Sequence, residues 1–452
     1  MKRIKSIRKI TYVQLLLLHG LIAVLVYLFR SFAQVYFLFV IGYFIYRIFS
    51  NGNKNDEVLL AAAYITGFEV FSRMTGGVGI SYEFAKFSVI GFMLIGMFFV
   101  GFTRKSWPYI LFMVLLTPGI LFSAINLDYD TNFLSAISFN LSGPICLAIT
   151  ALYCFKRKIT RERFEHILLA ILLPIISMAV YLFLYTPNIR DVLSGTHSNF
   201  AASGGYGPNQ VATVLGLGMI ILFGRIITIK SRFINILDLG LLAFVSYRGI
   251  ITFSRGGIVT AAVCAAAFIL VYFLTADRRE KSTLLPRIAF IAGVIMVTWL
   301  YSSISTLGLI DKRYSNQDAA GRVKEDVSTG RAELMKTELD AFYEAPFTGI
   351  GVGKVKEFRL DSTGIESATH NEVSRLFSEH GLFGLIALMV LVTTPLSMIF
   401  KKKQSPYLVT FLLFWLLTIS HSSMRIAAPA FIYGLALIHI IHAKPKTIIH
   451  RK

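Results

Sequence analysis

The chain has 452 residues, of which 55% are hydrophobic and 15% are charged, and its formal net charge at pH 7 is +20. A soluble domain carries about 25% charged residues, so this composition excludes an ordinary soluble protein. The positive charge does not indicate nucleic-acid binding, because most of the Lys and Arg excess lies in short loops beside apolar runs. These runs are about 17 to 22 residues long, which suits α-helices that cross a bilayer and is too long for the strands of a membrane barrel.

Fourteen apolar spans are predicted, which places both ends of the chain on one side of the membrane. In chain order they cover residues 12–29, 32–49, 57–73, 85–102, 107–124, 134–154, 166–185, 208–226, 237–254, 256–275, 287–304, 381–400, 407–421 and 427–443. Two of these spans, 57–73 and 237–254, contain charged side chains, so the predicted number of spans is about 12 to 14. The predicted fold class is an all-α polytopic membrane protein with one large structured periplasmic loop. Its parts are a transmembrane region of about 11 spans (1–304), that loop (305–370) and C-terminal transmembrane helices (371–452).

Charge bias predicts the orientation of these spans. Lys and Arg gather at both ends of the chain and in alternate loops, whereas residues 125–133 contain two Asp and no basic residue. The positive-inside rule makes the basic set, with the N- and C-termini, cytoplasmic. Residues 74–84, 186–207, 305–370 and 422–426 are then extracytoplasmic, where chemistry must use an already activated substrate.

No metal or cofactor motif is found in the sequence. Cys146, Cys154 and Cys264 fall in or at the end of apolar spans and lack the spacing of metal ligands. There is no H-E-x-x-H motif and no Cys/His cluster. We therefore predict neither a catalytic metal nor a cofactor, and we interpret the cysteines as small core residues.

The extracytoplasmic loop 186–207 leads into the next span through a glycine-rich segment, Ser203–Gln210. Pro208 suits the first turn of a helix. Asn209 and Gln210 either cap that helix or hydrogen-bond a sugar, and capping is favoured. Arg190 is the one Lys or Arg of the loop.

Arg248 lies inside an apolar span, where a cation is costly and is a functional candidate by default. It precedes Arg255 by seven residues and is predicted to share its helical face. It either binds the same anion as Arg255 or pairs structurally with Glu69 or Glu83.

The segment Thr252–Gly257 joins two spans on the predicted extracytoplasmic side. Ser254 is placed to cap the following helix and Arg255 to lie in its first turn, and the two glycines leave the backbone open to a bulky group. Free N–H groups, a helix dipole and a guanidinium form a site suited to phosphate. The alternative is a positively charged turn at the membrane surface, which the charge bias disfavours on this side.

In the large loop, residues 330–344 have the spacing of an amphipathic helix, and Pro346 with the glycines that follow ends it. The segment Gly349–Lys354 fits neither a Walker loop nor G-x-G-x-x-G. Gly351 and Gly353 form either a tight loop beside a site or a plain turn.

The loop ends in Ala368-Thr369-His370-Asn371-Glu372. A neutral histidine accepts a hydroxyl proton near pH 7, which suits a general base. The alternative is a histidine that only hydrogen-bonds a loop. Glu372, Arg375 and Glu379 are spaced to share one helical face and to pair with one another.

Taken together, these segments resemble the bacterial O-antigen ligase/polymerase family of integral-membrane glycosyltransferases. The resemblance rests on the order and spacing of Ser254–Gly257, Gly330-Arg331, Pro346–Gly353, His370–Glu372 and Glu379–Gly384, and the hydropathy profile fits over nearly the whole chain.

The resemblance implies a metal-independent enzyme of the bacterial inner membrane that transfers a glycan from undecaprenyl diphosphate to a sugar hydroxyl, with its active site facing the periplasm. It implies that His370 is the base and that Arg255 binds the diphosphate. The second diphosphate ligand is Arg190, Arg248 or Arg331. Further candidates for substrate contacts are Asn371, Glu372, Gly351 and Gly353.

Within this family a repeat-unit polymerase is slightly favoured over a ligase that uses lipid A-core as acceptor. A second class is a membrane transporter or lipid-linked oligosaccharide flippase, with Glu69, Arg73 and Arg248 as pathway residues at membrane depth. A third is a structural subunit of an envelope complex. A transferase needs His370, a flippase tolerates its loss, and a structural subunit tolerates loss of both His370 and Arg255.

Overall fold

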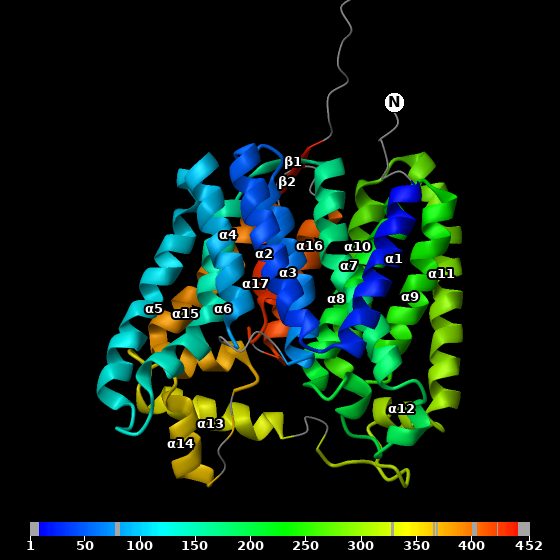
Figure 1. The fold of residues 1–452 in the computed structure, drawn as a ribbon. Coiled ribbons are helices and arrows are strands. Elements are labelled where there is room, and N and C mark those ends of the chain that lie inside the picture. Colours follow the sequence, from blue (N-terminus) through cyan, green and yellow to red (C-terminus); the bar gives the residue numbers. More distant parts are fainter. Residues whose placement is uncertain are drawn as a thin grey trace, which may run out of the picture.

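The computed structural model describes residues 9–76, 82–326, 330–364, 367, 369–399, 405–422 and 424–441. The fold is a bundle of helices that run roughly side by side, with short helices and loops forming a cap at one end (Figure 1). Ten of the described helices are long and apolar enough to cross a membrane, and three further apolar helices are shorter. The predicted all-α polytopic membrane class is confirmed.

In the described part of the chain, fourteen helices correspond to the fourteen predicted spans. They are α1 (Lys9–Leu28), α2 (Phe32–Asn51), α3 (Glu57–Met74), α4 (Phe84–Val100), α5 (Trp107–Asn126), α6 (Phe133–Cys154), α7 (Arg161–Tyr185), α8 (Pro208–Thr228), α9 (Arg232–Ile250), α10 (Arg255–Thr275), α11 (Arg278–Ser305), α15 (Glu372–Ile399), α16 (Pro406–Ile419) and α17 (Ala427–Ala436). Residue 400 and residues 442 and 443 of the predicted spans lie outside the described residues, as do Ala368 and both chain ends.

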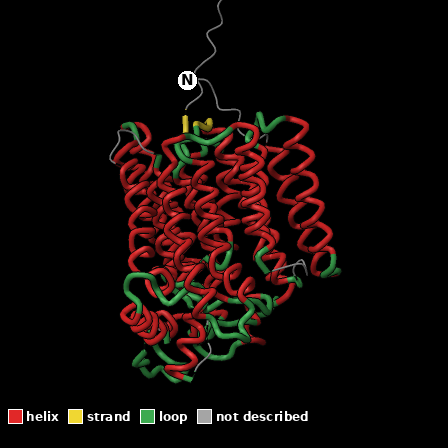
Figure 2. Tube along the Cα trace, turned by 90° about the vertical axis from the view of Figure 1, so that its left-hand side faces the viewer, coloured by secondary structure: helices red, strands yellow, loops and turns green. Residues whose placement is uncertain are grey.

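The cap is built from α12 (Leu309–Tyr314), α13 (Arg331–Glu344) and α14 (Lys354–Thr363). The amphipathic helix predicted for 330–344 is confirmed by α13, which lies across the end of the bundle (Figure 1). At the opposite end, β1 (Lys158–Thr160) pairs in parallel with β2 (His439–Ile441), visible as the two strands in Figure 2. Three 3₁₀ turns complete the described elements: η1 (Arg104–Ser106), η2 (Ile189–Val192) and η3 (Ala201–Ser203).

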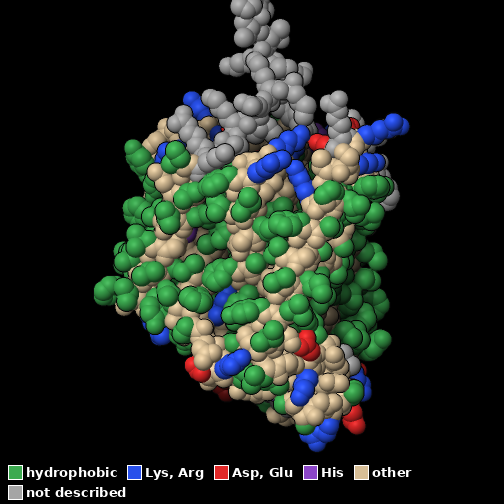
Figure 3. Space-filling view, turned by 90° about the vertical axis from the view of Figure 1, so that its right-hand side faces the viewer, with side chains coloured by type: hydrophobic (Ala, Val, Ile, Leu, Met, Phe, Trp, Pro, Cys, Tyr) green, Lys and Arg blue, Asp and Glu red, His purple; other side chains and the backbone are tan. Residues whose placement is uncertain are grey.

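Helix α3 lies inside the bundle and is buried along nearly its whole length. It approaches α7 so closely that a Cβ on Gly67 would lie 2.2 Å from the carbonyl oxygen of Ile171. Its charged residues are therefore enclosed by protein rather than exposed to lipid. On the outer surface, hydrophobic side chains cover the middle of the bundle, and most charged side chains lie towards its two ends (Figure 3). This is the surface expected of a protein surrounded by lipid.

Two of the predicted spans have different ends in the structure. The predicted span 427–443 is too long, since α17 ends at Ala436. The chain turns there because Lys156 N–H donates to the Leu437 carbonyl (2.9 Å) and the following residues pair with β1. The predicted span 237–254 ends four residues early, at Ile250, because the chain turns before α10. Within the described residues all three cysteines are buried and unpaired, as predicted for core residues.

Candidate functional site

Arg255 is the first residue of α10, as predicted, and a constrained turn places it there. Phe253 has a left-handed backbone (φ 59°), and its carbonyl accepts a hydrogen bond from Arg313 Nε (3.0 Å). Ser254 occupies the N-cap position with an extended backbone, but its hydroxyl donates to Asn209 Oδ1 (2.8 Å) instead of capping the helix. The start of α10 is thus fixed by contacts with α12 and with the start of α8.

The two glycines after Arg255 permit close packing. A Cβ on Gly257 would lie 2.1 Å from the carbonyl oxygen of Ala212, so α10 touches the backbone of α8. A Cβ on Gly256 would lie 2.5 Å from Cδ2 of His421. From the sequence, these glycines were expected to leave the backbone open to a bulky group. In the structure they pack against α8 and the His421 ring instead.

Three arginines from distant parts of the chain, Arg255, Arg313 and Arg331, come together at the start of α10. Arg331 is the first residue of α13, after a left-handed Gly330 (φ 79°). Burial, followed by the charge of Arg255, lowers the pKa of Arg331. Burial and the charges of Arg255 and Arg331 lower the pKa of Arg313. Because like charges held together are costly, this cluster favours an anionic ligand.

His370 lies beside the same cluster. Burial and then, in that order, the charges of Arg425, Arg331 and Arg359 together lower its pKa to about 4. The ring is therefore neutral at pH 7 and can accept a proton. Arg425 also fixes the loop that carries His370, since its Nη2 donates to the carbonyl of Thr369.

The described residues between α16 and α17 (420–422 and 424–426) form no helix, and they carry Arg425 into the site. Their backbone groups bond to charged side chains of the bundle. The Met424 N–H donates to Glu372 Oε2 (3.3 Å), and the Ala427 N–H donates to Glu69 Oε2 (2.6 Å). The Arg425 carbonyl accepts from Arg73 Nη1 (3.1 Å). Irregular backbone is tolerated at membrane depth only where protein or a cavity satisfies it, and these side chains meet that need.

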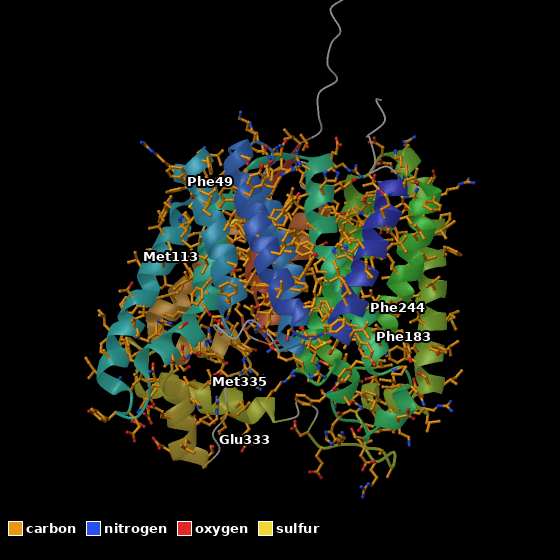
Figure 4. The ribbon with its side chains drawn as sticks, viewed as in Figure 1. Phe49, Met113, Phe183, Phe244, Glu333 and Met335 are labelled. Atoms are coloured by element: carbon orange, nitrogen blue, oxygen red, sulfur yellow. The ribbon has the colours of Figure 1, made fainter. Side chains whose placement is uncertain are left out.

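A cavity of about 240 Å³ lies between part of α13 and the bundle, beside His370. Met335 lies on the side of α13 towards the bundle, and Glu333 lies on the side away from it (Figure 4). The lining residues are Arg331, Ala332, Leu334, Met335, Glu338, His370, Asn371 and Ser420. The cavity thus places a neutral imidazole and a guanidinium around one space.

The position of α13 depends on a buried ion pair. Glu338 Oε1 accepts from Arg359 Nη2 of α14 (2.7 Å), and both side chains are 1% exposed. The second oxygen of Glu338 accepts from the Ser374 hydroxyl of α15. One carboxylate therefore joins three helices around the cavity, and removing either partner would leave a buried charge.

Asn371 and Glu372 hold the start of α15. Asn371 Oδ1 accepts from the Val373 N–H (2.9 Å), which caps the helix. Glu372 is fully buried and pairs with Arg375, which also lies 3.9 Å from Glu379 Oε2. The pairing predicted for these three charged residues is confirmed. Asn371 lines the cavity, whereas Glu372 is occupied by structural contacts.

Gly351 and Gly353 wedge the loop after α13 against the bundle. Both have positive φ (103° and 88°), and a Cβ on Gly351 would lie 2.9 Å from the backbone nitrogen of Ser123. The Gly353 N–H donates to Glu379 Oε1 (2.9 Å). These contacts connect the loop to α5 and α15, so the structure places these glycines in packing positions.

Arg248 and Arg190 are not brought to the arginine cluster by any contact found in the described residues. The Arg248 guanidinium donates to the carbonyls of Leu182 (2.7 Å), Thr186 (3.2 Å) and Ala202 (3.4 Å). Its predicted pairing with Glu69 or Glu83 is wrong, because these carboxylates pair with Arg73 and Lys86. Its predicted face shared with Arg255 is also wrong, because the turn at 251–254 separates the two helices. Arg190 is exposed in η2.

Arg313 and Arg425 were missed by sequence reasoning. A signal existed for Arg425, because it is an arginine in a short loop on the side that charge bias keeps poor in basic residues. Arg313 carries no comparable signal, since it is one of many charged residues in a polar loop. No group of three or more His, Cys, Asp or Glu side chains among the described residues is arranged to hold a metal ion.

Comparison with known families adds an independent observation. Residues 239–389 match the family model described as O-antigen ligase. The match, over about a third of the chain, agrees with the resemblance found in the sequence. The segment shared with the O-antigen ligase family runs from α9 into α15, so it contains Arg255, Arg331 and His370 but ends before Arg425. No match was found among curated proteins or among solved structures.

Proposed function

We propose that this protein is a glycosyltransferase of the bacterial inner membrane that moves a glycan from undecaprenyl diphosphate to a sugar hydroxyl. The observation that carries this proposal is the meeting of neutral His370 with Arg331 of the arginine cluster at one cavity, inside the segment matched by the O-antigen ligase family. A general base and an anion site at one place are the two elements that transfer from a diphosphate donor requires.

In the proposed reaction, His370 takes the proton of the acceptor hydroxyl while the oxygen attacks the anomeric carbon of the donor sugar. The bond between that carbon and the diphosphate oxygen breaks, the electron pair leaves with undecaprenyl diphosphate, and the configuration inverts. Arg255 and Arg331 hold the diphosphate, with Arg313 and Arg425 completing the positive surface. Guanidinium groups suit this task because they donate two parallel hydrogen bonds to phosphate oxygens.

The same arginines couple donor binding to the strength of the base. Without an anion, Arg425 and Arg331 help to hold the pKa of His370 at about 4. A bound diphosphate brings negative charge that offsets them, so the pKa of His370 rises towards neutrality. A base is most effective when its pKa lies near the working pH, and His370 would therefore become a better base once the donor is bound.

The cap end of the bundle faces the periplasm in this proposal, because the loops at the other end carry the basic residues that the positive-inside rule assigns to the cytoplasm. A repeat-unit polymerase is slightly favoured over a lipid A-core ligase.

The alternative function, a flippase, is disfavoured because its candidate pathway residues already bond to other groups of the protein. Glu69 pairs with Arg73 (2.5 Å) and caps the start of α17, and Arg248 is bonded to three carbonyls. These groups satisfy buried backbone, which is a structural task.

The test is a pair of variants, His370→Ala and Arg255→Ala, expressed at the wild-type membrane level in the host strain without its own copy. Surface glycans are then resolved on a gel. Loss of long glycan with single repeat units still on lipid A-core indicates a polymerase, and loss of all attached glycan with long carrier-linked chains indicates a ligase. Unchanged glycan in both variants would contradict the transferase and favour a transporter or a structural subunit.

A further inference from the structure

A network of three polar side chains lies outside the mechanism described so far. The Tyr206 hydroxyl donates to Gln210 Oε1 (2.7 Å), Gln210 Nε2 donates to the Tyr82 hydroxyl (3.0 Å), and the two hydroxyls are 3.0 Å apart. Tyr82 precedes α4, Tyr206 precedes α8, and Gln210 lies in the first turn of α8. These three residues are called the tyrosine platform below.

The tyrosine platform differs from the paired tyrosines that only pack inside the bundle. Tyr82 is 43% exposed, whereas Tyr109 and Tyr433, whose hydroxyls are 3.1 Å apart, are both fully buried. An exposed aromatic ring with hydroxyl and amide groups beside it retains the capacity to bind a ligand.

Arg73 fixes the tyrosine platform next to the candidate site. Its guanidinium carbon lies 3.7 Å from the centre of the Tyr82 ring, and its Nη1 donates to the Arg425 carbonyl (3.1 Å). The charge of Arg425 interacts with Tyr82 and Tyr206 as well as with His370. Arg73 therefore contacts both Tyr82 of the platform and Arg425, the residue whose charge acts on His370.

This chemistry suits a sugar better than a phosphate or a lipid chain. The C–H faces of a pyranose pack on aromatic rings, and its hydroxyls exchange hydrogen bonds with hydroxyl and amide groups. We propose that Tyr82, Tyr206 and Gln210 form a carbohydrate subsite, which holds a sugar of the glycan whose reacting end lies at His370 and Arg425. This subsite rests on the proposed function, since it assumes that the substrate of the site is a glycan.

The test measures binding without turnover. The protein carries His370→Ala to block chemistry, and the ligand is the host's repeat-unit oligosaccharide released from its carrier, observed by saturation-transfer NMR. Tyr82→Ala and Gln210→Ala are compared with Tyr36→Phe, which removes a hydroxyl from another tyrosine pair of the bundle, Tyr36 with Tyr64. We expect the two platform variants to weaken binding by about threefold to tenfold and Tyr36→Phe to leave it unchanged.

Equal binding by folded platform variants and the Tyr36→Phe control would overturn the subsite. If oligosaccharide binding depends on the platform but the His370→Ala variant still makes normal surface glycan, the subsite stands and the proposed reaction is refuted. Where transfer is active, the donor and the acceptor are varied separately in the Tyr82→Ala protein. The substrate whose KM rises is the one that contributes the bound sugar, and a KM unchanged for both would contradict the proposal.

Discussion

The pH dependence of transfer offers a sharp test of how Arg425 acts on His370. With a pKa of about 4, His370 is neutral at pH 7 and becomes protonated only as the pH falls through that value. The value of kcat/KM should therefore be level through the neutral range and fall on the acid side, where the base is lost. Arg425 is the first charged cause of the lowered pKa, after burial.

Replacing Arg425 with Gln removes that charge, so the pKa of His370 should rise towards its ordinary value and the acid limb should move to higher pH. A single neighbouring charge shifts a pKa by about one unit or more, which sets the expected displacement. Arg425→Lys is the matched control, because it keeps the positive charge while losing the guanidinium geometry. The assay is conversion of lipid-linked oligosaccharide by purified protein between pH 3 and 8.

The burial of the ring would remain in both Arg425 variants, so the comparison isolates charge. The titration of His421, whose pKa burial also lowers to about 4, is separated by repeating the profile with His421→Gln. An acid limb at the same pH in Arg425→Gln and in the wild type would refute the electrostatic coupling.

Three further variants test the packing of the site. Gly257→Ala forces α8 and α10 apart and should cost about 1 to 3 kcal/mol, seen as a lower melting temperature, whereas Gly240→Ala, with open space around it, should not; equal temperatures would contradict the close contact. Arg359→Gln breaks a buried pair at a cost of about 3 to 5 kcal/mol and should make the cap sensitive to protease, unlike Arg322→Gln in an exposed pair; equal digestion would show that the buried pair does not hold the cap. Arg248→Gln should reduce the amount of folded protein and leave the donor KM unchanged in what remains, and a raised KM would restore it as a diphosphate ligand.

Much of the architecture was predictable because hydrophobic spans are a local property of the sequence. The helices that correspond to the fourteen predicted spans, and the helix over 331–344, follow from run length and periodicity, apart from the ends of α9 and α17. The pairing of Glu372 with Arg375 and Glu379 was predictable for the same reason, since spacing along one helix fixes it.

What could not be predicted depends on contacts between distant segments. The short α17 and the irregular segment before it exist because Glu69, Arg73 and Glu372 satisfy that backbone, and no local pattern shows such a partnership. Arg248 illustrates the reverse error. A cation at membrane depth indicates function by default, yet here it is bonded to carbonyls at the end of α7 and in the loop that follows.

The most direct test of the central claim is turnover of lipid-linked oligosaccharide by the purified protein with and without the imidazole of His370. We expect the wild-type protein to release undecaprenyl diphosphate and to lengthen or transfer the glycan, and His370→Ala to bind the donor without releasing it. Release of undecaprenyl diphosphate at the wild-type rate by His370→Ala would contradict the assignment of His370 as the base.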